Sequence, residues 1–231
     1  MCYNQNYLIK PRKGGEKMII FVVLSDTLLW GIRKTTEYVA DRYGQVIANL
    51  YSERLYRNRD RYNRLLRGEI SEEDYWMSVR QGTPVSVREA EGFYTKALMC
   101  AKPGLMEILN SIKSHPSQIP SCKGRIEYGR PDVQLLCDYN KERKSKIKEF
   151  HSDLFEECSR SYWSFEYRQI VPDKGYLERI LNVAGVGPKE AFLVAGEPFS
   201  TTAASLAGIP NQMYVNPDRF KKHLLEYGFE L

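Results

Sequence analysis

Three short, predominantly apolar segments constrain the fold of this chain most strongly. They are Met18–Leu24, Val133–Cys137 and Ala191–Ala195, each five to seven residues long and followed by polar or turn-forming residues. Apolar runs of this length are typical of strands that are buried on both faces of a parallel sheet. Helical patterns separate them, so the sequence predicts a doubly wound α/β fold with helices on both faces of the sheet.

The longest helical stretch lies between the first two of these strands. It runs with interruptions from about Trp30 to Arg80 and resumes from Val87 to Met99. Ser71, which precedes three acidic residues, is a suitable N-cap for one of its helices. Because this block interrupts the alternation of strands and helices, we predict an inserted helical cap. The predicted division is a core of residues 18–30 and 100–231, a cap with its connections at 31–99, and a disordered extension at 1–17.

Weaker patterns complete the predicted core. Residues 115–131 are expected to form a long surface loop, because Pro, Gly and Ser recur there. Two further short strands are expected at Tyr162–Phe165 and Met213–Val215. Further helices are expected at Lys141–Phe150, Pro172–Ala184, Ser200–Ala207 and Arg219–Tyr227.

Composition excludes several classes of protein. No apolar run approaches the ~20 residues of a membrane span, and the polar, basic N-terminal stretch lacks the apolar region of a secretory signal. The five cysteines are scattered, which indicates neither a disulfide framework nor a zinc site. The formal net charge is only +5, and the basic run Lys141–Lys148 is typical of a solvated helix face. We therefore expect a cytoplasmic protein that binds neither membranes nor nucleic acid.

Three longer stretches resemble a known superfamily. Residues 67–76 read RGEISEEDYW, residues 102–113 read KPGLMEILNSIK, and residues 171–209 read VPDKGYLERILNVAGVGPKEAFLVAGEPFSTTAASLAGI. In this order and spacing they resemble the haloacid dehalogenase (HAD) superfamily of hydrolases, in the subgroup with a small helical cap. The resemblance covers nearly the whole chain from Met18 onward, and it implies a HAD-like, Rossmannoid core.

The resemblance also implies a chemistry whose first residues are missing here. HAD enzymes place a nucleophilic carboxylate at the end of the first strand and an acid–base carboxylate two residues later, in the pattern DxDGT. Aligned on Thr27, Val23 takes the nucleophile position and Ser25 the acid–base position. A one-residue deletion would instead make Asp26 the acid–base group and Leu24 the nucleophile. The nucleophile position is aliphatic in both alignments.

The other three motifs of the superfamily are altered as well. The Ser or Thr that ends the next strand is Cys137 here, and Asp138 follows it. The lysine that neutralises the transferred phosphate corresponds to Val171. The acidic pair that holds the Mg²⁺ cofactor of the family corresponds to Ala195 and Gly196, so the oxygen ligands that Mg²⁺ requires are absent at these positions. We therefore predict that the chain uses no cofactor.

Four altered motifs in an otherwise intact scaffold favour a pseudoenzyme, which has lost hydrolase catalysis and acts by binding a protein partner or a small ligand. The alternative is an active hydrolase of the phosphatase type with an atypical site around Asp26. Convergence of Asp26, Asp138, Asp173 and Glu197 at the strand ends would favour a rebuilt acidic site. Turn and helix capping is the simpler role for these side chains.

The predicted cap is rich in tyrosine and arginine, which has two interpretations. These residue types are favoured at recognition surfaces, but they also suit the packing of amphipathic helices. The sequence does not identify the protein or small molecule that the chain would bind. It is also compatible with a homo-oligomer. The residues concerned are Tyr38, Tyr43, Tyr51, Tyr56, Tyr62, Tyr75, Trp76, Arg54, Arg57, Arg59, Arg61, Arg64 and Arg67.

Overall fold

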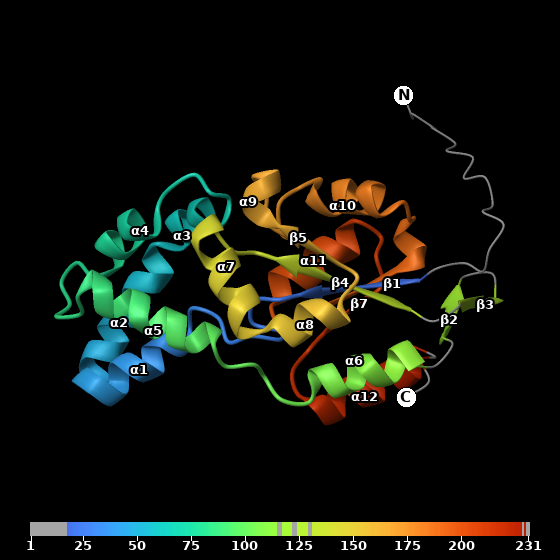
Figure 1. Ribbon diagram of the computed structural model, residues 1–231, viewed down its shortest axis with the longest axis horizontal. Coiled ribbons are helices and arrows are strands. Elements are labelled where there is room, and N and C mark those ends of the chain that lie inside the picture. Colours follow the sequence, from blue (N-terminus) through green and yellow to red (C-terminus); the bar gives the residue numbers. More distant parts are fainter. Residues whose placement is uncertain (1–17, 115–116, 122–123, 129–130, 228, 230–231) are drawn as a thin grey trace.

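A parallel sheet forms the centre of the computed structural model, which describes residues 18–114, 117–121, 124–128, 131–227 and 229 (Figure 1). The predicted extension at 1–17 lies outside the described residues. The sheet has the strand order β5-β4-β1-β6-β7, and every pairing in it is parallel. The predicted α/β fold with a parallel sheet is therefore confirmed. Its strands are β1 (Ile19–Val23), β4 (Asp132–Cys137), β5 (Arg160–Trp163), β6 (Ala191–Ala195) and β7 (Asn211–Met213).

Helices cover both faces of this sheet because successive strand residues point to opposite sides. Ile20 and Val22 belong to one apolar cluster, together with residues of four helices of the core and of the helices within residues 34–98. Phe21 and Val23 belong to the cluster on the other face, together with residues of two helices. The first set of helices is α6 (Leu105–Ser114), α7 (Lys141–Phe150), α8 (Ser152–Glu157) and α12 (Pro217–Glu226), and the second is α10 (Tyr176–Ala184) and α11 (Pro198–Leu206).

Five helices between β1 and α6 form a separate layer, which we call the helical block. In Figure 1 it lies beyond the end of β1, on the side toward which the strands run. Ser71 caps one of these helices as predicted, since its Oγ accepts a hydrogen bond from the Asp74 N–H at 3.1 Å. The block consists of α1 (Lys34–Tyr43), α2 (Gln45–Arg57), α3 (Arg59–Leu66), α4 (Glu72–Val79) and α5 (Val87–Leu98).

Charged side chains fasten the helical block to the core. Arg143 of α7 is only 1% exposed, and its guanidinium forms a two-pronged ion pair with Glu72 of α4. Arg67, which follows α3, makes a second two-pronged pair with Asp173, one arm of which is 2.7 Å long. Paired guanidinium–carboxylate contacts of this kind fix orientation as well as distance. The block is thus held in one position over the strand ends.

The structure corrects several local predictions. Residues 115–131 are not simply a loop, because β2 (Ser117–Ser121) and β3 (Gly124–Tyr128) pair as an antiparallel hairpin. Pro120 within the first of these strands weakens the strand signal in the sequence. Two short helices, α8 and α9 (Ser164–Tyr167), were not expected.

The helix predicted from Pro172 begins only at Tyr176. Gly175 has a positive φ of 82° and is the residue immediately before the helix. The Asp173 side chain does not cap this helix, because it accepts hydrogen bonds from Arg67 and from the Ile170 N–H. In the described part of the chain, no helix is both long and apolar enough to cross a membrane.

Candidate functional site

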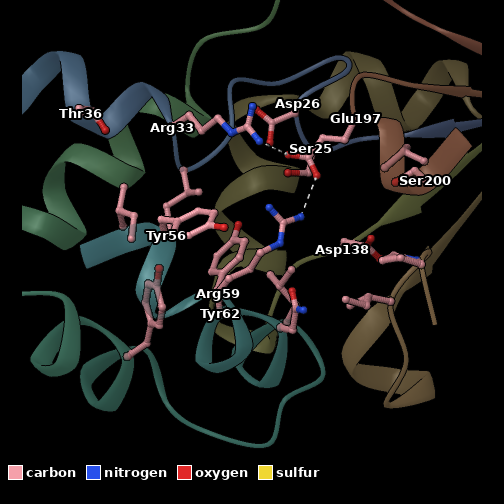
Figure 2. Close-up of a pocket in the computed structure, with 18 of the residues that line it drawn as sticks. Ser25, Asp26, Arg33, Thr36, Tyr56, Arg59, Tyr62, Asp138, Glu197 and Ser200 are labelled. Carbon is pink, nitrogen blue, oxygen red and sulfur yellow. Dashed lines mark ion pairs between the residues drawn. The ribbon is translucent and has the colours of Figure 1, made fainter. Parts of the chain in front are cut away.

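A pocket of about 410 Å³ lies between the helical block and the carboxyl ends of the central strands. Its core side comes from the segments that follow β1, β4 and β6, and its other side comes from the first helices of the block (Figure 2). This is the edge at which open α/β sheets bind ligands. The lining residues are Val23, Ser25, Asp26, Ile32, Arg33, Thr36, Ser52, Leu55, Tyr56, Arg59, Tyr62, Asn63, Leu66, Tyr75, Asp138, Ile170, Pro172, Glu197 and Ser200.

The loop after β1 places Asp26 at the base of this pocket. Asp26 has a φ of 57°, a left-handed conformation that is uncommon for a residue with a side chain. Its carboxylate accepts a hydrogen bond from the Gly31 N–H at 3.1 Å, and its carbonyl accepts one from the Lys102 ammonium. Thr27 fixes the next residue of the loop, since its Oγ1 accepts a 2.6 Å hydrogen bond from the Gly196 N–H. The loop is therefore held by contacts on three sides.

Two glycines make room for this conformation of Asp26. A Cβ atom on Gly31 would overlap the Asp26 carboxylate, and a Cβ atom on Gly196 would overlap the Asp26 carbonyl group. Gly196 does not have a positive φ, so the space around it is what requires glycine there. The space that a side chain at position 196 would need is thus occupied by the backbone of the β1 loop.

Burial raises the pKa of Asp26, and the nearby Glu197 carboxylate raises it further. Lys102 acts in the opposite direction on this pKa, as does Arg33. Burial lowers the pKa of Lys102 in turn, while Asp26 favours its charged form. Lys102 precedes α6 and supplies a cation near Asp26, although the motif position for lysine is Val171. The sequence analysis missed this role, because Lys102 lies 76 residues away along the chain.

Asp138, directly after β4, is a second acidic group of the pocket. It is only 7% exposed, and one carboxyl oxygen accepts a hydrogen bond from the Val171 N–H at 3.2 Å. The other oxygen, Oδ1, is buried without a hydrogen-bond partner. Burial raises the pKa of Asp138 to about 7, with smaller upward contributions from Asp173 and Glu197. The group therefore titrates near neutral pH.

Glu197 joins the core to the helical block at the pocket. Its two carboxylate oxygens lie 3.6 Å from Arg33, which precedes α1, and 3.6 Å from Arg59 of α3. Figure 2 shows both ion pairs. The Arg59 guanidinium also lies over the Phe199 ring, 4.6 Å from its centroid. Both pocket arginines are therefore already paired with a carboxylate.

Most of the altered motif positions have an apolar role. Val23, Val171 and Ala195 are buried in the same apolar cluster, which packs against α10 and α11. Cys137 is buried in the cluster on the opposite face, and burial raises the pKa of its thiol. Of the positions predicted from the sequence, Val23, Ser25, Asp26 and Asp138 line the pocket. Thr27 and Gly196 do not line it, and the hydrogen bond between them holds the β1 loop in place.

The predicted acidic convergence is found in part. Asp26, Asp138 and Glu197 line the same pocket, whereas Asp173 is engaged by Arg67 outside the set of lining residues. Among the residues that the structure describes, no three His, Cys, Asp or Glu side chains are arranged to hold a metal ion. The Mg²⁺ ion that the superfamily uses does not fit these residues, because the carboxylates are dispersed and Gly196 has no room for a side chain.

The tyrosines and arginines of the predicted cap divide between the packing of the helical block and the lining of the pocket. Tyr51 and Trp76 are fully buried in the helical block, which is the packing role. Tyr56, Arg59, Tyr62 and Tyr75 line the pocket, and Tyr56 is 79% exposed. Helical periodicity alone does not separate the two groups, because the pocket arises only when the block meets the sheet.

Comparisons with known proteins identify the fold. The chain matches no family model and no curated protein. A HAD family enzyme from Bacteroides thetaiotaomicron superposes with a TM-score of 0.60 at 15% identity, over 87% of this chain and 95% of that chain. A crystal structure of a dehalogenase gives a TM-score of 0.61 at 16% identity, over 84% and 83% of the two chains. The L-2-haloacid dehalogenase from Xanthobacter autotrophicus, with chloropropionic acid covalently bound, gives 0.58 at 13% identity, over 93% and 85%.

The chain has a HAD-like fold. This confirms the resemblance on which the sequence analysis rested. Identities of 13–16% compare folds and carry no information about activity. The geometry of the HAD-like pocket is therefore the basis for any statement about function.

Proposed function

We propose that this HAD-like protein is a pseudoenzyme that binds a small molecule in the pocket between its core and its helical block. In this proposal the helical block serves as the cap of the HAD-like core, with residues 31–99 as the cap and its connections. The proposal assigns the pocket to binding without turnover. Its strongest support is the β1 loop around Asp26.

The backbone of this loop occupies the place of a catalytic group. Gly196 leaves no room for a metal-binding side chain, because the Asp26 carbonyl lies against its Cα atom. Val23, at the nucleophile position, packs in an apolar cluster and is 4% exposed. Neither Val nor Gly has a side-chain atom that could attack a substrate or hold a metal ion. Restoring catalysis would therefore need the loop to be rebuilt, and a single substitution would not suffice.

The pocket itself favours a small ligand over a protein partner. Its volume of about 410 Å³ falls in the ~300–1,000 Å³ range of small-molecule sites. Apolar side chains such as Ile32, Leu55 and Leu66 share the lining with tyrosines and a few charged groups. This mixture of an apolar wall with a few convergent polar groups is typical of ligand sites.

One observation favours the alternative of an active hydrolase around Asp26. The Asp26 carboxylate lines the pocket, and burial raises its pKa, as in a general acid. Its hydrogen bond from Gly31 and its left-handed backbone also suit a purely structural role. The two functions are distinguished by activity.

The test is hydrolysis of p-nitrophenyl phosphate with millimolar Mg²⁺, and dehalogenation of 2-chloropropionate, with Asp26→Asn as the comparison. The pseudoenzyme proposal predicts release of nitrophenol and chloride at the rate of a protein-free control. Turnover that the unaltered protein shows and Asp26→Asn lacks would refute the proposal and establish the alternative.

A further inference from the structure

We propose that the pocket recognises a small organic ammonium compound, with the Asp138 carboxylate as the group that contacts its nitrogen. The inference rests on the proposed binding function and specifies the chemical class of the ligand. It follows from which polar groups of the pocket already have partners and which do not.

Of the three carboxylates that line the pocket, Asp138 is influenced by the fewest cations. Glu197 pairs with Arg33 and Arg59, and Lys102 and Arg33 both act on the Asp26 carboxylate. Asp138 makes no ion pair among the described residues, and the cation that acts on it is Arg67. Arg67 is committed to Asp173 by a two-pronged contact. A ligand can therefore complete the pairing of the pocket by bringing one positive charge to Asp138.

Asp138 also has an unused hydrogen-bonding atom. Its Oδ2 accepts the Val171 N–H, while Oδ1 is buried with no partner. Buried polar atoms without a partner are rare in folded proteins, because each loses its hydrogen bonds to water without a replacement. The hydroxyl of Tyr75 is a second orphan atom among the residues that line the pocket. A ligand that donates a hydrogen bond to the Asp138 carboxylate would satisfy the first of these atoms.

The remaining walls suit an organic cation better than an anion. Tyr56 and Tyr62 line the pocket, and the faces of aromatic rings attract positive charge. Both arginines of the lining already have the Glu197 carboxylate beside them, which offsets their charge and repels an anionic ligand. Inorganic phosphate is for this reason a poor fit, even though the fold is that of phosphate-processing enzymes.

The test compares probes of different charge. Phenethylamine, 2-phenylethanol and phenylacetate share one carbon skeleton and are the cation, the neutral probe and the anion, and tyramine and isopentylamine are two further cations. Binding is measured by isothermal titration and by the saturable rise in melting temperature that any ligand of the native state produces. At least one amine should bind at least tenfold more tightly than 2-phenylethanol, and phenylacetate should not bind.

The variant Asp138→Asn should remove this preference for the amine, because Asn keeps the shape but carries no charge. Asp218→Asn, on the exposed start of α12, removes one charge away from the pocket and should leave the preference unchanged. Failure of every amine to bind, equal binding of alcohol and amine, or an amine preference that survives in Asp138→Asn would each overturn the inference.

The pH dependence gives an independent readout. Burial raises the pKa of Asp138 to about 7, and the groups that act on it are Asp173, Glu197, Arg67 and the Val171 N–H. The amines stay protonated between pH 6 and 8, so their affinity should follow ionisation of Asp138 and rise about tenfold over this range. An amine affinity that falls as the pH rises would contradict the assignment to Asp138.

The activity assay separates the two proposals. Turnover of p-nitrophenyl phosphate together with an Asp138-dependent amine preference would refute only the pseudoenzyme function. Absence of turnover together with no amine preference would refute only the ligand class.

Discussion

Replacing Gly196 by alanine tests the arrangement around Asp26 with a single methyl group. A Cβ atom at this position would lie about 1 Å inside the 3.0 Å limit that real Cβ contacts respect, against the backbone carbonyl of Asp26. A backbone group cannot rotate away as a long side chain can. The β1 loop must therefore shift by about 1 Å, which also strains the hydrogen bond between Thr27 Oγ1 and the Gly196 N–H.

The expected cost combines these two effects. Overpacking in a well-packed region costs about 1–3 kcal/mol, and a buried hydrogen bond contributes about 0.5–1.5 kcal/mol. We therefore expect Gly196→Ala to lower the free energy of unfolding by about 2–4 kcal/mol, measured by urea denaturation monitored by tryptophan fluorescence. The slope of the transition should be unchanged, since the surface exposed on unfolding stays the same.

Gly92 provides the matched control. It lies within helix α5, and a Cβ atom there would have no other atom within 4 Å. Gly92→Ala should therefore stabilise the protein by roughly 0.5–1 kcal/mol, because alanine is the better helix former. A Gly196→Ala variant within about 0.5 kcal/mol of the unaltered protein would refute the reasoning, and space for a metal-binding side chain would then exist.

Three further predictions address the core, the pocket and the contact between the core and the helical block. Val23→Asp should lower the free energy of unfolding by about 1–3 kcal/mol or more in urea denaturation, because it places a carboxylate in an apolar cluster; a neutral effect would mean that the strand end is open to water. Asp138→Asn should gain stability over the unaltered protein as the pH rises from about 4 to about 7, by on the order of 2–4 kcal/mol. The sign follows because the folded pKa of Asp138 is raised to about 7, so its ionisation opposes folding above the unfolded pKa; a difference that does not change with pH would contradict it. Glu72→Ala should lower the free energy of unfolding by about 3–5 kcal/mol, because it leaves the buried Arg143 without its carboxylate. The control Glu73→Ala, at an exposed position, should change it by no more than about 0.5 kcal/mol. Equal effects of the two variants would mean that the buried pair does not hold the helical block to the core.

The sequence predicts β1, β4 and β6 well because these strands are short, predominantly apolar runs, as is typical of strands buried on both faces. Val23, Val171 and Ala195 are identified as apolar replacements at motif positions, and the structure places all three in one cluster. The roles of Lys102, Arg33 and Arg59 are not predictable in this way. Each meets its partner from a segment distant along the chain: Lys102 contacts Asp26, and Arg33 and Arg59 meet Glu197 where the helical block contacts the core.

The hairpin at 117–128 shows a different limit. Its pairing comes from two segments too short and too polar to stand out from a loop, and one of them contains a proline. The steric role of Gly196 is equally hidden. A glycine at a motif position reads as a lost ligand in the sequence, whereas the structure shows that the neighbouring loop requires it.

The most direct test of the central claim, that the nucleophile is lost, is the intact mass of the protein during exposure to substrate. HAD enzymes form a covalent intermediate on their nucleophilic carboxylate, which acid quenching preserves for mass spectrometry. After incubation with p-nitrophenyl phosphate and Mg²⁺, or with 2-chloropropionate, the proposed function predicts a mass identical to that of the untreated protein. A phosphoryl adduct, or a 1-carboxyethyl ester formed as chloride leaves 2-chloropropionate, that appears on the unaltered protein and is missing in Asp26→Asn would contradict it.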